Sequence, residues 1–175
     1  SPQPMDQTPP ELRVMVDANI LIAGSVWPRW PYEVLQHALR GDFRLVLCEY
    51  VIQQARRRIQ ARFPVYVEPF DGLLEACRYE WVADPSREQV AQHHDLVRDL
   101  TDVPVALAAI NARVDYLVSE DKDLTVRDET TAKLHQSLSV MVSGAFLREV
   151  MGWSSEALEE VRRRTWRDIQ SPDEP

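Results

Sequence analysis

The chain has 175 residues, of which 45% are hydrophobic and 27% are charged, and its net charge is −8. This length suits one domain with a full core, and no apolar run approaches the ~20 residues that a membrane span needs, so no membrane association is expected. The acidic balance argues against broad, non-specific binding of nucleic acid, but it does not exclude a nuclease whose carboxylates hold a divalent metal ion.

Strand-like and helix-like segments alternate along the chain. Residues 1–10 are rich in proline and polar residues, which predicts a disordered tail, and residues 171–175 predict a second tail. Short apolar runs predict strands at 12–16, 43–47, 80–83, 116–119 and 138–142. Helical spacing of apolar residues predicts helices at 31–40, 51–63, 69–79, 87–100, 103–112, 144–151 and 155–169.

This order of elements predicts an α/β fold. Repeated strand–helix–strand units favour a mostly parallel central sheet with helices on both faces. We expect one domain over residues 11–152, followed by a C-terminal helix over residues 153–170. A partial apolar stripe of Leu158, Val161, Thr165 and Ile169 leaves three roles open for that helix: it docks on the domain, pairs with a second subunit or holds a partner.

Aspartates follow two of the predicted strands at their carboxyl ends. Asp17 comes directly after strand 12–16, and Asp121 and Asp123 follow strand 116–119. Asp102 precedes the helix that begins at residue 103 and is expected on the same edge. In such sheets the functional crevice lies beyond the carboxyl ends of the strands, so acids distant in sequence are predicted to meet there.

Each of these acids also has a purely structural interpretation. Asp102 is well placed as a helix N-cap, and Asp17 can orient a turn with Asn19. Asp123 can pair with Lys122 or Arg127 at the surface. These roles explain the acids one at a time but not their concentration on one edge, where carboxylate oxygens suit Mg²⁺ or Mn²⁺.

Three stretches make the chain resemble the PIN domain family of metal-dependent nucleases, which includes many bacterial toxins. They are V-M-V-D-A-N-I-L-I-A, T-D-V-P-V-A-L-A-A-I-N-A-R-V-D-Y-L-V-S-E-D-K-D-L and L-S-V-M-V-S-G-A-F-L-R-E-V. With their spacing they cover about Leu12 to Met151. The middle stretch is the most specific, because an acid, a small-residue helix and a strand running into D-x-D occur in the family's order.

The resemblance implies a PIN-like three-layer fold and assigns roles to the acids. Asp17, Asp102 and Asp121 would be the principal ligands of one or two Mg²⁺ or Mn²⁺ ions, and Asp123 would complete the catalytic set. Asn19 and Ser119 would orient these ligands.

One position departs from the family pattern. A glutamate usually follows the second strand, but the corresponding segment here is C-E-Y-V-I-Q-Q-A-R-R-R-I, which puts Cys48 at a serine position and Gln54 at the glutamate position. Glu49 lies about 140° around the helix from Gln54, and Glu120 adjoins Asp121, so neither is a convincing substitute. Because glutamine lacks the negative charge of that glutamate, Gln54 predicts weaker metal binding and weaker activity.

The resemblance implies an endoribonuclease that hydrolyses RNA phosphodiester bonds with metal-activated water, as the toxin of a toxin–antitoxin pair. Its partners would be RNA, an antitoxin protein and a second copy in a homodimer. The alternative is a PIN-like module that binds RNA or protein but cleaves weakly. Phosphoryl transfer on another acidic α/β scaffold ranks third, since the chain lacks the adjacent acids of response regulators and the early D-x-D of haloacid-dehalogenase phosphatases.

Other features have both functional and structural interpretations. Arg56 and Arg57 can contact RNA or form a solvated helix face, while the last-helix arginines, Arg162 to Arg164, are expected to be solvated. The aromatic residues around Trp27 can stack on bases, pack in a loop or form a subunit contact. Two isolated cysteines favour a reduced, cytoplasmic protein.

Overall fold

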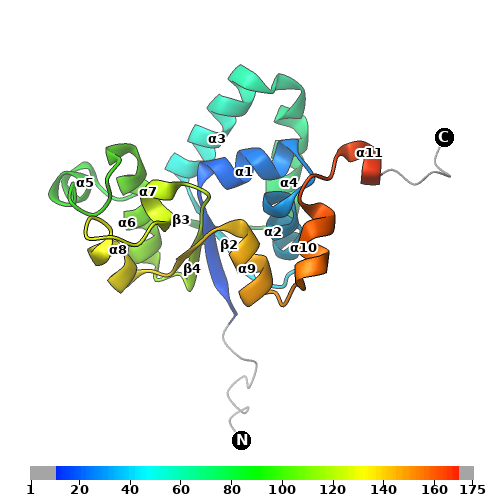
Figure 1. Ribbon diagram of the computed structural model, residues 1–175. Coiled ribbons are helices and arrows are strands. Elements are labelled where there is room, and N and C mark those ends of the chain that lie inside the picture. The colour runs from blue at the N-terminus through cyan, green and yellow to red at the C-terminus, as the bar shows by residue number, and fades with distance from the viewer. Residues whose placement is uncertain (1–10, 170–175) are drawn as a thin grey trace, which may run out of the picture.

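The computed structural model describes residues 11–169, so the two predicted tails and residue 170 lie outside the described residues (Figure 1). Within that range, five parallel strands form one sheet in the order β3-β2-β1-β4-β5. The strands are β1 (Arg13–Val16), β2 (Arg44–Cys48), β3 (Glu80–Val82), β4 (Tyr116–Val118) and β5 (Val140–Met141). The prediction of an α/β fold with a parallel sheet is confirmed.

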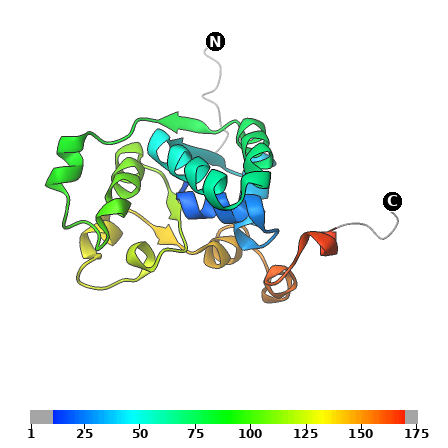
Figure 2. The same cartoon turned by 90° about the horizontal axis from the view of Figure 1, so that it is seen from above.

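The helices form two layers, one on each face of the sheet (Figures 1 and 2). One layer contains α1 (Ala18–Val26), α2 (Trp30–Leu39), α3 (Glu49–Arg62), α4 (Val67–Cys77) and α9 (Ser143–Glu149). The other contains α5 (Arg87–Gln92), α6 (Val103–Ala112) and α8 (Ala132–Ser137). The shorter elements are the 3₁₀ turns η1 (Pro64–Tyr66) and η2 (Leu100–Asp102) and the helices α7 (Lys122–Thr125), α10 (Ser155–Val161) and α11 (Trp166–Ile169).

The core lies on both sides of the central strands. Val14, Met15 and Val16 of β1 are fully buried, as expected of a parallel strand covered by helices on both faces. Met15 pairs in register with Val46 of β2 and Leu117 of β4. Among the helices described, none is both long enough and apolar enough to span a bilayer.

Helix α1 begins directly after β1, in a segment where the apolar pattern gave no predicted element. Asp17 is its N-cap, and nearly every residue of the helix is buried, so the periodicity of a half-exposed helix is lacking. The helix packs closely on α2 at Gly24, where a Cβ atom would lie 2.4 Å from Leu35 Cδ1. A Cβ atom there would also lie 3.1 Å from Pro31 O, so the Leu35 side chain and the α2 backbone would have to shift to accommodate any larger residue.

Two predicted helices were too long. The helix predicted at 87–100 ends at Gln92, because the backbone then turns to bury Leu96 and Val97 and becomes extended at Asp99. The helix predicted at 155–169 is broken into α10 and α11, with Thr165 donating backbone and hydroxyl hydrogen bonds to Asp168 at the start of α11 (2.8 and 3.0 Å).

The C-terminal segment docks on its own domain. Trp30 Nε1 donates to Leu158 O (2.9 Å), and Trp166 Nε1 donates to Val26 O (2.8 Å). Arg164 forms a half-buried ion pair with Glu33 (2.6 Å), so the prediction that this arginine is solvated is wrong. In the loop of aromatic residues that begins at Trp27, Trp30 therefore serves a contact within the chain.

Candidate functional site

The carboxyl ends of β1 and β4 meet where the strand order reverses. The chain moves from β1 to β2 and β3 on one side, and returns to β4 and β5 on the other. Asp17 directly follows β1, and its backbone N–H donates to the carbonyl of Val118 at the end of β4 (3.2 Å). This junction is a topological switch point, the place where parallel α/β sheets bind ligands.

Asp17 is buried and fixed in position by two donors. Its Oδ1 accepts from Ile20 N (3.0 Å), and its Oδ2 accepts from the hydroxyl of Ser119. Burial raises the pKa of Asp17 to about 6, against the lowering effect of these hydrogen bonds, while the nearby charges of Asp121 and Glu120 add to the rise. The carboxylate is held in one orientation, and within residues 11–169 it forms no ion pair.

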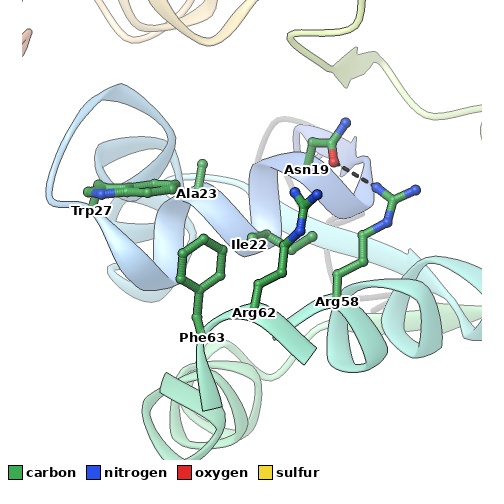
Figure 3. Close-up of a pocket in the computed structure, with 7 residues that line it drawn as sticks. All are labelled: Asn19, Ile22, Ala23, Trp27, Arg58, Arg62 and Phe63. Carbon is green, nitrogen blue, oxygen red and sulfur yellow. Dashed lines mark hydrogen bonds between the residues drawn. The ribbon is translucent and has the colours of Figure 1, made fainter. Parts of the chain in front are cut away.

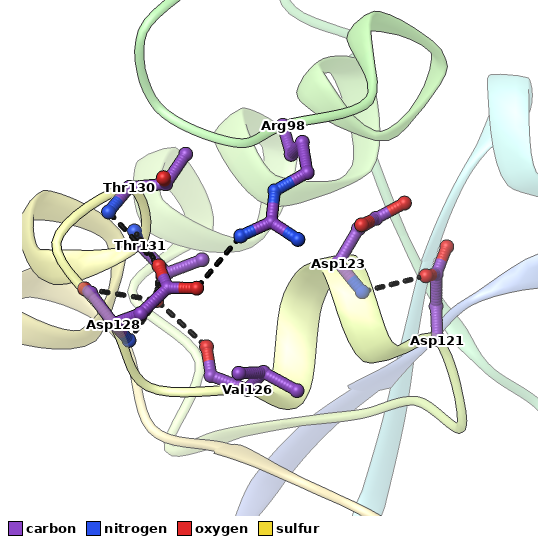
Figure 4. Close-up of polar contacts among 7 residues, drawn as sticks. All are labelled: Arg98, Asp121, Asp123, Val126, Asp128, Thr130 and Thr131. Atoms are coloured by element: carbon purple, nitrogen blue, oxygen red, sulfur yellow. Dashed lines mark hydrogen bonds and ion pairs between the residues drawn. The ribbon is translucent and has the colours of Figure 1, made fainter.

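Ser119 links Asp17 to Asp121. Its hydroxyl oxygen also accepts the backbone N–H of Asp121 (3.0 Å), so one buried side chain orients both acids. Asp121 is the N-cap of α7 and accepts from Asp123 N (2.9 Å), as Figure 4 shows. This arrangement turns the end of β4 toward the end of β1.

Asp102 does not use its side chain as the predicted helix cap. Within the described residues it makes no capping hydrogen bond to α6, and its Oδ2 is buried with no hydrogen-bond partner. Burial, followed by the close approach of Asp121 and the charges of Asp99 and Asp17, raises the pKa of Asp102 to about 8. Asp102 and Asp121 can share a hydrogen bond only if one of them is protonated. The unpaired oxygen and the raised pKa of Asp102 therefore both reflect crowded negative charge, which either a proton or a cation can relieve.

Asp99 belongs to the same site and was missed from the sequence. Carboxylate oxygens of Asp99, Asp102 and Asp123 all lie within 4.8 Å of one another. Thr101 donates backbone and hydroxyl hydrogen bonds to Asp99 (2.9 and 2.8 Å), which lower its pKa. Asp99 was treated as part of a predicted helix; the three-residue spacing to Asp102 is the signal that would have found it.

These side chains surround a pocket of about 230 Å³, which we call the acid pocket. It is lined by Asp17, Ala18, Asn19, Gln54, Arg58, Asp99, Thr101, Asp102, Val105 and Asp121. The structure thus brings together Asp17, Asn19, Gln54, Asp102 and Asp121, and it places Asp123 beside Asp102.

Glu120 and Glu49, the two glutamates nearest to replacing the family's glutamate, make hydrogen bonds outside the acid pocket. Glu120 accepts from the backbone N–H of Ser143 (2.7 Å) and from its hydroxyl, at the start of α9. Glu49 accepts from Gln53 Nε2 (2.7 Å) and Trp81 Nε1 (3.3 Å). Gln54 therefore occupies the α3 side of the acid pocket without a neighbouring glutamate among the residues described.

The arginine at the pocket differs from those singled out in the sequence. Arg56 turns to α4, where it pairs with Asp71 (2.6 Å) and lies over the Phe70 ring. Arg57 is exposed and does not line the pocket. Arg58 does line it, and its guanidinium donates to Asn19 Oδ1 (2.9 Å; Figure 3).

The donor set fits a hard divalent cation. Carboxylates from three chain segments converge with the amide of Gln54, and the partnerless oxygen of Asp102 is one that a cation would satisfy. Mg²⁺ and Mn²⁺ take such oxygen ligands and retain several waters. A cation here would also replace the proton that the raised pKa of Asp102 holds at neutral pH.

Comparison with known proteins bears on the family and the fold of the chain. A family model described as the PIN domain matches residues 13–123. The fold is similar to the crystal structure of PAE2754 from Pyrobaculum aerophilum, with a TM-score of 0.56 and 13% identity over 81% of this chain and 91% of the other. It is also similar to VapBC2 from Rickettsia felis bound to a DNA fragment from their promoter, with a TM-score of 0.53 and 15% identity over 75% of this chain and 98% of the other. A search of curated proteins found no match.

Proposed function

Since the chain belongs to the PIN domain family, we propose that it is a metal-dependent endoribonuclease and the toxin of a toxin–antitoxin pair. The observation that carries the proposal is the acid pocket, where Asp17, Asp99, Asp102 and Asp121 face one another with a buried oxygen of Asp102 unsatisfied among the described residues. Such crowding of like charge is costly unless the acids serve a ligand.

In this proposal Asp17, Asp102 and Asp121 hold Mg²⁺ or Mn²⁺, and Asp99 and Asp123 complete the acidic set. A divalent ion so held would lower the pKa of water for attack on phosphorus and offset the charge of the phosphate.

The chain's other residues position the acids and the substrate. Ser119 donates its hydroxyl to the Asp17 carboxylate and accepts the backbone N–H of Asp121, so it ties both acids to one position. Arg58 offers a guanidinium beside the acids that can contact a phosphate oxygen. Asn19, bonded to Arg58, holds that guanidinium over the pocket.

The biological role rests on the same family. One structure with a similar fold contains VapBC2 bound to a promoter DNA fragment, which supports an antitoxin partner for this chain. We also propose that the chain forms a homodimer. We propose that it acts in the cytoplasm, because its two cysteines, Cys48 and Cys77, are free thiols.

Gln54 favours a second candidate function. A neutral amide faces the acid pocket where the family carries a glutamate, so a module that binds RNA but cleaves it weakly would show this residue. The carbonyl oxygen of Gln54 can still accept a hydrogen bond or coordinate a cation, but it contributes no negative charge to hold the cation.

The test is cleavage of structured RNAs by purified protein with Mg²⁺, Mn²⁺ or EDTA. We expect metal-dependent cleavage that Asp121→Asn abolishes and that Glu160→Gln, an exposed change on α10, leaves intact. RNA that binds but stays uncut with both metals would favour the binding module. RNA that neither binds nor is cut would reject both functions.

A further inference from the structure

A second pocket adjoins the acid pocket between α1 and α3 (Figure 3). Its volume is about 550 Å³, and it shares Asn19 and Arg58 with the acid pocket. We call it the aromatic pocket, because Trp27 and Phe63 form its far end. The two pockets meet at these shared residues, so a chain-like ligand that passes over Asn19 and Arg58 can reach both.

We call the acid pocket and the aromatic pocket together the groove. Helices α1 and α3 present side chains to it at matching intervals of four residues. From the acid pocket outward these are Asn19 and Ala23 on α1 with Trp27 at its C-cap, and Gln54, Arg58 and Arg62 on α3. Residues four apart share a helix face and lie about 6 Å apart along the axis. Figure 3 shows the Arg58–Asn19 bond at one end and the Trp27 and Phe63 rings at the other.

The charge of the aromatic pocket suits an anionic ligand. Two arginines line it, and no carboxylate does so among the described residues, in a chain whose net charge is −8. The Arg58 guanidinium donates a hydrogen bond to the neutral amide of Asn19, and Arg62 makes no ion pair within residues 11–169. Both guanidiniums therefore keep their charge free for a ligand, whereas Arg56 on the same helix is neutralised by Asp71.

Trp27 supplies a flat apolar surface that is open to solvent. The residue is 38% exposed, and Phe63 contacts it edge-to-face, with ring centroids 5.4 Å apart and planes at 79°. Trp30 and Trp166 instead use their indole nitrogens to hold the C-terminal segment. Trp27 is thus the indole of this loop that remains available for stacking.

We propose that this groove binds the single-stranded RNA next to the phosphate that is cleaved, with one base stacked on Trp27 and backbone phosphates on Arg62 and Arg58. Aromatic faces and positive charge along one track are the features by which proteins hold single strands without reading their sequence. The inference rests on the proposed nuclease function, since it takes the acid pocket as the place of cleavage.

The test is binding of a fluorescein-labelled, eight-nucleotide oligoadenylate, followed by anisotropy in buffer containing Ca²⁺. We expect Trp27→Ala to weaken binding about tenfold and Trp27→Phe to restore most of the affinity, because stacking on an aromatic ring is retained. Arg62→Gln should weaken binding and flatten its dependence on salt. The matched controls, Trp81→Ala on β3 and Arg148→Gln on α9, are exposed and lie outside the groove, so they should bind as wild type does.

Thermal melts will verify that each variant folds, and Arg62→Gln, an exposed change, tests the groove if Trp27→Ala does not fold. Wild-type affinity in both Trp27→Ala and Arg62→Gln would overturn the proposal, as would the absence of oligonucleotide binding by the wild-type protein. Groove-dependent binding without any cleavage would leave this inference standing and remove the nuclease function.

Discussion

Replacing Asp102 with asparagine should stabilise the metal-free protein. The pKa of this side chain is raised from 3.8 to about 8, so the folded state binds its proton more tightly than the unfolded state does. The contribution of protonated Asp102 to the free energy of unfolding is complete below about pH 4 and is lost as pH rises through about 8. Above that pH, the ionised carboxylate weakens the fold, and asparagine avoids the charge while keeping the shape.

The size of the effect follows from the pKa change. At about 1.4 kcal/mol per pKa unit the full rise would be worth about 6 kcal/mol. The side chain is only half-buried, so water screens much of this, and we expect about 2 kcal/mol at pH 8.5. For a chain of this size, that corresponds to a rise in Tm of about 4 to 8 °C.

The assay is thermal unfolding followed by circular dichroism, in EDTA at pH 5 and pH 8.5. The gain should be large at pH 8.5 and small at pH 5, and Glu160→Gln, which removes an exposed charge, should show neither change. Added Mn²⁺ should raise the Tm of the wild type by binding the folded state, and should raise that of Asp102→Asn much less. An Asp102→Asn protein that melts below the wild type in EDTA at pH 8.5 would refute the reasoning.

Three further substitutions test separate parts of the site and fold. Gln54→Glu should raise Mn²⁺ affinity and RNA cleavage by about tenfold or more, measured by calorimetry and initial rates; unchanged values would show that the amide is not limiting. Ser119→Ala should cost about 1 to 3 kcal/mol in urea unfolding and weaken Mn²⁺ binding, because buried Asp17 loses its hydroxyl donor. Arg164→Gln should cost about 1 to 3 kcal/mol by breaking the half-buried pair with Glu33, without changing Mn²⁺ affinity; equal stability would mean that the pair does not hold the C-terminal segment.

The sheet could be predicted from the sequence because its strands are nearly continuous apolar runs between helical patterns. The edge where Asp17 and Asp121 meet followed from topology alone, since Asp17 directly follows one strand and Asp121 comes shortly after another. Helix α1 was missed because it is buried almost all round and so lacks an amphipathic period. The break after Gln92 was missed because burial of Leu96 outweighs the local preference for a helix.

Finer details of the site depended on side-chain directions that spacing does not fix. Asp99 enters the site only because the helix predicted through it ends early and Thr101 then holds its carboxylate. Arg58 lines the pocket, whereas Arg56, two residues earlier on the same helix, is captured by Asp71. A run of arginines predicts positive charge, but the acid that neutralises one of them lies on another helix.

The central question is whether aspartates from separate segments bind one divalent ion. Titration calorimetry with Mn²⁺ at pH 8 answers it directly, comparing wild type with Asp121→Asn and with Glu160→Gln. We predict that wild type and Glu160→Gln bind at least one ion per chain with release of protons, and that Asp121→Asn binds about tenfold more weakly or not at all. Equal binding by wild type and Asp121→Asn, or no heat of binding from the wild type at millimolar Mn²⁺, would contradict a metal site at the switch point.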